Sequence, residues 1–461
     1  MTPALHPLAG LPEPHEVFRG FSNRPGSFLL ESASPTGGCG RYSFLGADPF
    51  LRLVAHKDRL CWRDLSGRSW EEPGDVRDAV RGVLAQHRCV PHPELPFCGG
   101  AVGYWSYELG ARWEEVPRRF ADRSGAAEVE LGFHDGTLAY DHLHKRWYAA
   151  AVPLPGRSVG ETLERLRGLA EAWRNVPEQA GGSPPCGQPV AQMSQAAYSE
   201  AVHRIRAYIA SGDVYQVNLA HRFEMPVSAD SYELYCRLRR ISPAPFAGFL
   251  QTEFGQVVSC SPESFLRVRG RTVETRPIKG TRRRGTDRTE DERLSRELRE
   301  NAKERAELLM IVDLERNDLG RVCVPGSIHV PALYVVEEHP TVFHLVATVT
   351  GELRSGCDAL DLLHAAFPGG SITGAPKIRA MQVIDELETA PRGIYTGAIG
   401  YLGFDGDCDL NIAIRTIVCA GGKATYHVGA GIVWDSDPIS EYEETLAKGR
   451  ALREALIGST T

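Results

Sequence analysis

The sequence lacks the features that mark membrane, secreted or nucleic-acid-binding proteins. It has no run of 18 apolar residues, and its start, MTPALHPLAGLPEP, lacks the charged segment and apolar stretch of a signal peptide. Its 11 cysteines include no CxxC pair, which disfavours a disulfide framework or a structural zinc site. The net charge of −7 disfavours bulk attraction to nucleic acid or anionic lipid. We therefore expect a cytoplasmic protein that binds neither nucleic acid nor membranes.

What the chain does have is ordinary globular composition and many turns. Hydrophobic residues make up 42% and charged residues 24%, and 461 residues suffice for a large core. The 47 glycines and 30 prolines favour many turns over a helical bundle. A breaker-rich stretch at 175–192, NVPEQAGGSPPCGQPVAQ, predicts a linker between an N-terminal region, 1–174, and a C-terminal region, 193–461.

The hydrophobic periodicity predicts a mixture of helices and strands. Helical spacing of apolar residues indicates helices over 196–210, 290–312, 376–387 and 438–456. Strand-like apolar runs cover 27–33, 40–46, 99–110, 397–404, 410–420 and 424–434. The predicted fold class is α/β or α+β, with large, mostly antiparallel sheets.

Two pairs of glutamates stand three residues apart on predicted helices, so each pair shares a helix face. They are Glu304 with Glu307 and Glu441 with Glu444. Each pair adjoins apolar sequence, and four converging carboxylates would suit a hard cation such as Mg²⁺, completed by water and an anionic substrate. Solvated surface glutamates are the alternative.

A glycine-rich turn, FPGGSITGAPK at 367–377, leads directly into a predicted helix. Free backbone N–H groups at a helix start favour a carboxylate or phosphate, although the spacing excludes a P-loop. A tight turn with capping glycines is the alternative. Gly429 and Gly431, inside a predicted strand, indicate either a close approach of the backbone to another group or a bulge.

Two cations stand out for their surroundings. Arg415 lies within the predicted strand 410–420 among apolar neighbours, where it would pair with a carboxylate of the protein or of a ligand. Lys279, in RPIKGTRRRG, has cationic neighbours that would lower its pKa and suit a nucleophile or base. It could equally be one more solvated basic residue.

Seven motifs follow one another in an order that closely resembles the chorismate-binding enzymes. They are SPESF (261–265), RPIKGT (276–281), AELLMIVDLERNDLGR (306–321), FPGGSITGAPK (367–377), IRT (414–416), GAGIV (429–433) and SDPISEYEET (436–445). The resemblance covers 193–455, and LLES (29–32), RYSFLG (41–46) and GAVGYWSYE (100–108) extend it into the N-terminal half. It implies two large sheets packed together with helices outside.

The resemblance also implies a substrate and a set of site residues. Chorismate, a dicarboxylate, would be bound together with Mg²⁺. The implied metal-site residues, some acting directly and some through water, are Glu304, Glu307, Glu441 and Glu444. The implied substrate contacts are His344, Ser371, Tyr395, Arg415, Gly429 and Gly431. Mg²⁺ would take the ring carboxylate, while Arg415 and backbone N–H groups would take the enolpyruvyl carboxylate.

Two positions discriminate among the members of this family. Gln216 stands where isochorismate and salicylate synthases carry a lysine that activates water, which disfavours hydration chemistry. Lys279 stands in PIKGT, where anthranilate synthases typically read PIAGT. This lysine, together with YQVNL and SPAPF (242–246), resembles aminodeoxychorismate synthase component I.

That likeness implies an enzyme that converts chorismate and ammonia to 4-amino-4-deoxychorismate for p-aminobenzoate and folate biosynthesis. Lys279 would attack C2 as the C4 hydroxyl leaves, with Glu263 as general acid, and ammonia would then displace the lysine. One departure is Arg283, which stands in GTRRRG where the family usually has proline. Anthranilate synthase component I, or a non-catalytic regulator that binds chorismate or an amino acid, are the alternatives.

The resemblance implies two further partners. No cysteine lies in a GxCxG-type nucleophile motif, so ammonia would come from a separate glutamine amidotransferase subunit. Relatives bind tryptophan at the LLES segment, where Glu31 and Ser32 could hold an α-amino group. A plain strand end is the other interpretation of this segment.

Overall fold

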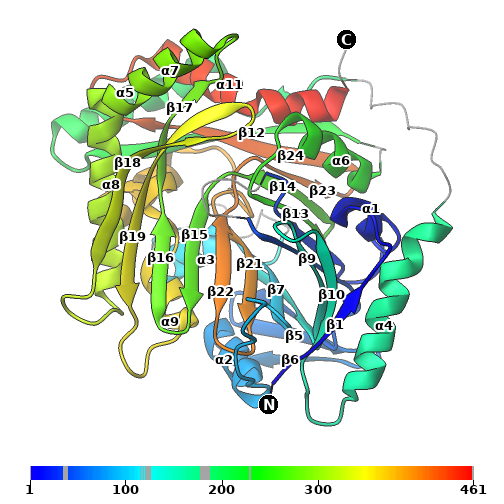
Figure 1. The fold of residues 1–461 in the computed structure, drawn as a ribbon. Helices are drawn as coiled ribbons and strands as arrows, with labels where there is room; N and C mark the ends of the chain where they lie inside the picture. Colours follow the sequence, from blue (N-terminus) through cyan, green and yellow to red (C-terminus); the bar gives the residue numbers. More distant parts are fainter. Residues whose placement is uncertain are drawn as a thin grey trace.

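The structure is a computed structural model that describes residues 2–34, 40–114, 116–117, 119, 126–176, 187–227 and 230–458. Two twelve-stranded sheets form its body, and the pairings between their described strands are antiparallel. Helices lie outside both sheets (Figure 1). The predicted fold class is confirmed.

The two sheets are built as follows. The first contains β1 (Ala4–Leu8), β2 (Phe28–Glu31), β3 (Tyr42–Gly46), β9 (Gly136–Asp141), β10 (Arg146–Ala151), β11 (Val190–Ala191), β12 (Gln216–Pro226), β13 (Phe246–Gln251), β14 (Gln256–Ser261), β20 (Gly374–Ala375), β23 (Thr416–Ala420) and β24 (Lys423–Ile432). The second contains β4 (Leu51–His56), β5 (Arg59–Asp64), β6 (Ser69–Pro73), β7 (Gly100–Trp105), β8 (Val129–His134), β15 (Ser264–Arg269), β16 (Thr272–Arg276), β17 (Ile278–Arg283), β18 (His329–Glu338), β19 (Val342–Glu352), β21 (Ala398–Gly403) and β22 (Cys408–Ile412).

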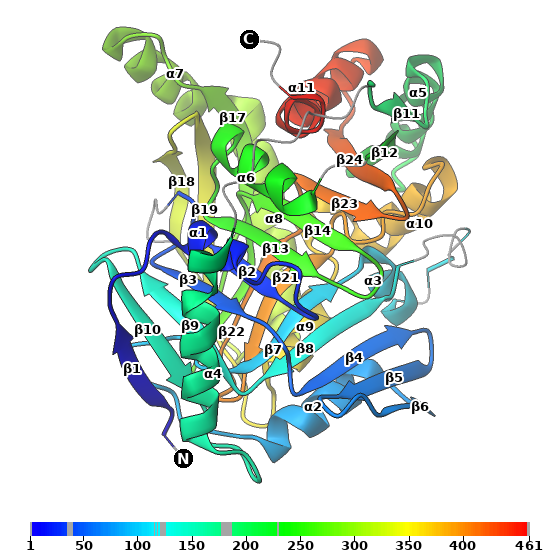
Figure 2. The same ribbon diagram turned by 90° about the vertical axis from the view of Figure 1, so that its right-hand side faces the viewer.

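The helices cover the outer faces of these sheets. They are α1 (Pro14–Arg19), α2 (Val76–Gln86), α3 (Tyr107–Trp113), α4 (Val159–Glu171), α5 (Gln195–Ala210), α6 (Ser231–Ile241), α7 (Arg288–Glu300), α8 (Ala302–Gly320), α9 (Ala359–Ala366), α10 (Lys377–Leu387) and α11 (Pro438–Ile457), with short 3₁₀ helices η1 (Ala172–Asn175) and η2 (Gly370–Ile372). In both ribbon views α7, α11 and β17 lie at the top, and α2, β5 and β6 at the opposite end (Figures 1 and 2). None of the described helices combines the length and the hydropathy needed to span a bilayer.

The regions before and after the predicted linker share both sheets. β2 pairs with β13 in the first sheet, and β7 pairs with β21 in the second. A large apolar core lies where the sheets face each other, with Phe28 and Phe44 from the first and Phe133 from the second. Within the predicted linker, 177–186 lie outside the described residues, and Val190–Ala191 form β11.

The predicted helix over 290–312 is wrong, because two helices occupy this stretch. α7 ends at Glu300 and α8 begins at Ala302, while Asn301 between them has φ −62° and ψ 112°. The Asn301 side chain accepts a hydrogen bond from the backbone N–H of Glu304 at 3.0 Å, which is the N-cap arrangement that asparagine favours. The apolar stripe continues across the break and therefore hid it. The new helix start places Glu304 and Glu307 in the first two turns of α8.

The single strand predicted over 410–420 is also wrong. β22 ends at Ile412 in the second sheet, and β23 begins at Thr416 in the first. Arg415 lies between them with φ +50°, so it does not project from the middle of a strand. Strands buried on both faces are apolar throughout, so the sequence pattern carries no signal for a change of sheet. The strand predicted over 99–110 similarly ends at Trp105, and α3 follows it.

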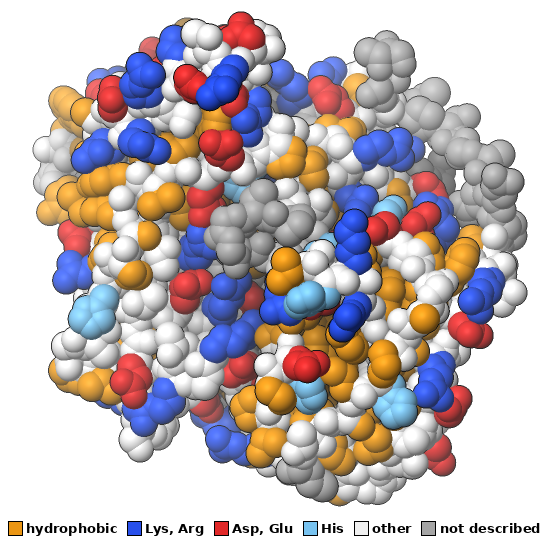
Figure 3. All heavy atoms as spheres, in the orientation of Figure 1, with side chains coloured by type: hydrophobic (Ala, Val, Ile, Leu, Met, Phe, Trp, Pro, Cys, Tyr) orange, Lys and Arg blue, Asp and Glu red, His pale blue; other side chains and the backbone are white. Residues whose placement is uncertain are grey.

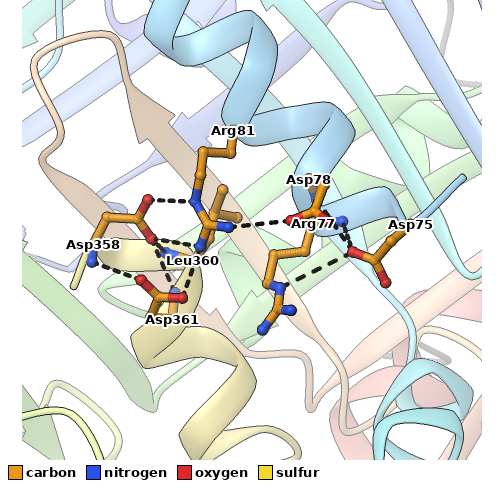
Figure 4. A network of polar contacts seen from close by, with 7 residues as sticks. All are labelled: Asp75, Arg77, Asp78, Arg81, Asp358, Leu360 and Asp361. Atoms are coloured by element: carbon orange, nitrogen blue, oxygen red, sulfur yellow. Dashed lines mark hydrogen bonds and ion pairs between the residues drawn. The ribbon is translucent and has the colours of Figure 1, made fainter. Parts of the chain in front are cut away.

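A charged network joins α2 to the start of α9 (Figure 4). Arg81 on α2 donates to Asp358 at 2.8 Å and to Asp361 at 2.7 Å. Asp358 is the N-cap of α9 and accepts hydrogen bonds from the backbone N–H groups of Leu360 and Asp361. α9 leads directly into the glycine-rich turn, so this network fixes the helix that carries the turn.

Candidate active site

The predicted catalytic pair lies at the end of the molecule formed by β17, α8 and α11. Lys279 is the second residue of β17, and Glu263 lies in the connection between β14 and β15. The Lys279 Nζ donates to the backbone carbonyl of Ser371 at 3.3 Å. Glu263 Oε1 accepts a hydrogen bond from the backbone N–H of Ile278 at 3.4 Å. Three segments distant in sequence therefore converge on one point.

The pKa of Glu263 is raised and the pKa of Lys279 is lowered, so the two values lie closer together than usual. Glu263 is only 5% exposed, and this burial raises the pKa of its carboxyl, while a hydrogen bond from Ser371 and the charge of Lys279 act against the rise. Burial also lowers the pKa of Lys279, and the nearby Lys448 lowers it further, against Glu307 and Glu263. Both shifts are toward the uncharged forms of the two groups.

The lowered pKa agrees with one of the two interpretations of Lys279, but its cause differs from the predicted one. The neighbouring arginines form ion pairs with acidic side chains. Arg282 pairs with Glu304 at 2.7 Å, and Arg283 pairs with Glu290 at 2.5 Å. Over α7, cationic and acidic side chains lie side by side at the surface (Figure 3). These arginines are paired with carboxylates, and burial is the main cause of the lowered pKa of Lys279.

The two glutamates on α8 lie beside Lys279. Glu304 Oε1 accepts from Arg282 at 2.7 Å, while its Oε2 is buried without a hydrogen-bond partner. Burial raises the pKa of Glu307, with Glu444 adding to the rise and Lys279 opposing it. Glu304 therefore has one carboxylate oxygen without a partner, and the ionised form of Glu307 is disfavoured by burial.

The two glutamates on α11 complete the group. Glu441 is buried and accepts a hydrogen bond from Ser436 Oγ at 2.6 Å, and burial raises its pKa. Glu444 is more exposed and pairs with Lys448 at 2.7 Å. Burial would raise the pKa of Glu444, but Lys448 brings it below its usual value.

The four glutamates fit a hard divalent cation by the chemistry of their donors. All four offer carboxylate oxygens, and the partnerless Oε2 of Glu304 is a buried acceptor. The described residues contain no group of three acidic, histidine or cysteine ligands already gathered at metal-binding distance. The acidic side chains are therefore near neighbours rather than a preformed coordination shell.

Gly429 and Gly431 lie where β24 passes closely against other groups. A Cβ at Gly429 would stand 2.6 Å from Asn218 Oδ1 and 3.0 Å from the Tyr395 hydroxyl, and one at Gly431 would stand 2.8 Å from Gln216 Nε2. The β12–β24 register runs unbroken through both glycines, so close approach is confirmed and the bulge is wrong. Both polar atoms of the Gln216 side chain and Asn218 Oδ1 are buried without partners, as groups that face a ligand are.

Arg415 has no ion pair with any described carboxylate, so the protein does not supply the internal salt bridge considered above. Its Nη1 donates to Ser242 Oγ at 3.3 Å, and burial lowers the pKa of the guanidinium. His344, on β19, hydrogen-bonds Thr281 Oγ1 at 3.0 Å. Burial and the charge of Arg415 hold the pKa of His344 well below its usual value. A neutral histidine thus lies near an unmatched arginine.

Tyr395 is 7% exposed and its ring stacks on His427, with centroids 5.1 Å apart. Its hydroxyl points toward Gly429, as the Cβ distance there shows. Ser371 is buried in η2, in the glycine-rich turn. The predicted substrate contacts therefore come from η2, the turn at 392–396 and β24, around the same end of the molecule.

Sequence reasoning missed two charged residues of this site. Lys448 lies one turn after Glu444 on α11 and donates to the Gly429 carbonyl at 3.2 Å. Its spacing from Glu444 was a visible signal.

Glu315 on α8 is buried and accepts from Thr275 Oγ1 at 3.1 Å. Burial, with the charge of Glu263, raises the pKa of Glu315 well above its usual value. An acidic residue on the apolar stripe of α8 was the signal here.

Glu31 and Ser32 lie away from this site, at a separate cavity of about 460 Å³ between the sheets. Glu31 Oε2 accepts from Tyr235 and from Arg239 at 2.7 Å, while its Oε1 is buried without a hydrogen bond. The Ser32 hydroxyl donates to the Tyr42 carbonyl at 2.9 Å. From the second sheet, Arg269, Tyr401 and Asp409 are among the residues that line the opposite wall.

The fold and the site together define an enzyme-like arrangement: a half-buried lysine and a buried glutamate beside helices that carry several carboxylates. The family model described as chorismate binding enzyme matches residues 37–454. The chain belongs to this family, and the predicted resemblance is confirmed.

Two curated relatives align over nearly the whole chain. Aminodeoxychorismate synthase component 1 from Klebsiella aerogenes is 39% identical over 457 residues, covering 97% of this chain and 98% of that protein. Anthranilate synthase component 1 from Streptomyces coelicolor is 41% identical over 448 residues, covering 93% and 83%. The solved structure of anthranilate synthase component I from Streptococcus pneumoniae is similar with a TM-score of 0.79 at 32% identity, covering 90% of this chain and 92% of that one. The chain is thus similar to enzymes with two different products.

Proposed function

We propose that this chain is an aminodeoxychorismate synthase component I, which converts chorismate and ammonia to 4-amino-4-deoxychorismate. The observation that carries the proposal is the placement of Lys279. Its Nζ lies 3.3 Å from the Ser371 carbonyl, next to Glu263, and burial lowers its pKa. An uncharged amine is the form of lysine that acts as a nucleophile. The similarity to the Klebsiella aerogenes protein supports the same assignment.

The first step forms a bond between Lys279 and the substrate. The Nζ lone pair attacks C2 of chorismate, the C1=C2 and C5=C6 double bonds shift to C1=C6 and C4=C5, and the C4–O bond breaks. Glu263, whose pKa is raised by burial, donates its proton to the departing hydroxyl, which leaves as water. The lysine is then joined to C2 as a secondary ammonium group.

The second step releases the lysine. Ammonia attacks C4, both ring double bonds shift back to C1=C2 and C5=C6, and the electron pair of the C2–N bond returns to Nζ. The ionised Glu263 takes one proton from the new ammonium group, which restores the starting state of the enzyme. One difficult substitution at a single carbon is thereby split into two allylic steps.

The remaining site residues would bind and orient the substrate. Arg415, which has no carboxylate partner among the described residues, would take the enolpyruvyl carboxylate, with backbone N–H groups beside it. The residues that would hold Mg²⁺ are Glu304, Glu307, Glu441 and Glu444. When bound, the cation would neutralise the ring carboxylate and polarise the ring.

The product formed from chorismate, Mg²⁺ and an ammonium salt at high pH tests this proposal. We expect 4-amino-4-deoxychorismate, which retains the enolpyruvyl group. Chorismate left unchanged would contradict the assignment as an enzyme.

Anthranilate synthase component I is the second candidate, favoured by the 41% identity to the Streptomyces coelicolor protein. In the same assay it would yield anthranilate, which has lost the enolpyruvyl group. That outcome would overturn the assigned reaction while leaving the family unchanged.

Two partners complete the proposal. A glutamine amidotransferase subunit would supply ammonia, so addition of such a subunit should make glutamine a nitrogen source. Tryptophan would occupy the 460 Å³ cavity, with its α-amino group near Oε1 of Glu31, which accepts no hydrogen bond. A tryptophan titration followed by thermal shift tests binding, and kinetics with and without tryptophan separate regulation from a structural role.

A further inference from the structure

A buried ion pair lies directly behind the substrate site. Arg392, 3% exposed, and Glu388, 4% exposed, stand four residues apart where α10 ends. Arg392 Nη2 donates to Glu388 Oε1 at 2.6 Å, and Nε donates to Oε2 at 3.0 Å. The pair is therefore bidentate, the strongest geometry for arginine and a carboxylate.

The remaining hydrogen bonds of this pair reach three separate segments of the chain. Arg392 donates to the Asn218 carbonyl on β12 at 2.7 Å and to the Ile372 carbonyl of η2 at 3.0 Å. It also donates to Thr396 Oγ1 at 3.2 Å. Glu388 Oε1 accepts from the backbone N–H of Ala220 on β12 at 2.9 Å.

Each of these segments carries a proposed substrate contact or pairs with a strand that does. Asn218 and Ala220 pair with Gly431 and Gly429 across the β12–β24 ladder. Ile372 directly follows Ser371, whose carbonyl accepts from Lys279. Thr396 directly follows Tyr395.

We propose that Arg392 and Glu388 are positioning residues, which hold β12, η2 and the 392–396 turn in the relative placement that chorismate binding and attack by Lys279 require. This inference rests on the proposed function. Neither side chain needs to touch the substrate, because both act through the backbone that carries the contacts.

Fold stability alone is a poor explanation for this pair. The cost of removing two charges from water roughly cancels their attraction, so a buried ion pair adds little net stability over an apolar pair of similar size. What the pair does provide is orientation, since the planar guanidinium fixes the directions of its hydrogen bonds to Asn218, Ile372 and Thr396. An apolar pair would fill the space without fixing the three segments.

The double variant Arg392→Met with Glu388→Leu separates positioning from stability, because it leaves no unpaired buried charge. We expect the variant to fold, with a thermal midpoint lowered by the lost hydrogen bonds to the backbone of Asn218, Ala220 and Ile372. We expect kcat/KM for chorismate to fall about 100-fold, the scale of a 1 Å misplacement at a reacting centre. The loss should appear in both KM for chorismate and kcat, with KM for ammonia unchanged.

Two further variants keep the test decisive. Arg392→Lys retains the charge but not the planar guanidinium, so it should fold and show a smaller loss in kcat and in KM for chorismate. If the double variant does not fold, Arg392→Lys tests the positioning role. Asp135→Asn is the control, because it disrupts an equally buried carboxylate that bonds Arg157 and Arg165 away from the site. It should lower the thermal midpoint and leave kcat/KM unchanged.

The outcomes separate the two proposals. If the folded double variant or, failing that, Arg392→Lys turns over chorismate as the wild type does, the positioning role is wrong and the proposed function stands. The role is also wrong if the loss of rate follows the loss of thermal stability and disappears at a lower assay temperature. If the wild type itself makes no 4-amino-4-deoxychorismate, the proposed function fails.

Discussion

The charged groups around Asp135 and those around Lys279 are arranged in opposite ways. Asp135 is buried at the end of β8, and its carboxylate meets Arg157 at 2.7 Å, Arg165, and the Thr162 hydroxyl at 2.9 Å. Burial by itself would raise the pKa of Asp135, but the two arginines bring it below its usual value. The carboxylate of Asp135 therefore meets two opposite charges.

Around Lys279 the charged groups are only partly paired with opposite charges. Burial lowers the pKa of the lysine and raises the pKa of Glu263 and of Glu307, so each ionised form is penalised. Arg415 nearby has no carboxylate partner in the described part of the chain. The paired charges around Asp135 stabilise the fold. The incompletely paired charges around Lys279 would be compensated by a charged substrate and a cation.

The largest expected effect is from Lys279→Ala. Removing the nucleophile should lower the amination rate about 10⁴-fold or more, as loss of a covalent nucleophile does in other enzymes. Binding of chorismate and Mg²⁺, followed by thermal shift, should be largely retained. Loss of chorismate binding in this variant would make the lysine a substrate clamp or a structural residue.

The next effect is expected from Glu263→Gln, which should lower kcat about 10²- to 10⁴-fold, the usual contribution of a general acid. The pH profile, measured at constant concentration of free ammonia, gives a sharper test. In the wild type the rate should rise as pH passes the lowered pKa of Lys279 and fall as Glu263 loses its proton. The variant should lose the fall at high pH and keep the rise at lower pH.

A smaller effect is expected from Glu307→Gln, which removes one of the incompletely compensated carboxylates on α8. The Mg²⁺ affinity, read by thermal shift without substrate, should fall about 10- to 100-fold. Glu290→Gln on α7 is a matched control, because its carboxylate pairs with Arg283 at the surface. Equal Mg²⁺ affinity in the two variants would remove Glu307 from the metal site.

No loss of activity per folded molecule is expected from Asp135→Asn, which changes the matched region. The free energy of unfolding at neutral pH should fall by about 3 kcal/mol, as when a buried ion pair loses one partner. Because the folded-state pKa of Asp135 lies below its usual 3.8, this stabilisation is present above that value and is lost as pH falls through the folded-state pKa. Unfolding curves from pH 7 to pH 3 check this. A difference between wild type and variant that grew at low pH would contradict it.

The sequence predicted the fold class and the two glutamate pairs because both depend on local patterns. Alternation and helical spacing are visible in one dimension, and a three-residue spacing places Glu304 with Glu307 on one face whatever the tertiary structure. The broken helix at Asn301 was missed because its apolar stripe continues across the break. The spacing of apolar residues therefore predicted which helix face is buried, but not the break between α7 and α8 at Asn301.

What could not be predicted depends on contacts distant in sequence. Arg415 reaches the site because the chain changes sheets at 413–415, and nothing in its apolar neighbourhood marks that change. The pair Arg392 and Glu388 looks like an ordinary i,i+4 surface pair in sequence. Only packing against β12 and η2 buries it and directs its hydrogen bonds to the site. The family resemblance supplied the site residues that spacing alone could not.

The most direct test of the central claim is the mass of the protein after incubation with chorismate and Mg²⁺ in the absence of ammonia. We expect an increase equal to the mass of chorismate less one water, located by peptide mapping at Lys279 and absent from Lys279→Ala. Addition of an ammonium salt should release it as 4-amino-4-deoxychorismate. Amination by the wild type with no such adduct, and with undiminished activity in Lys279→Ala, would contradict the account.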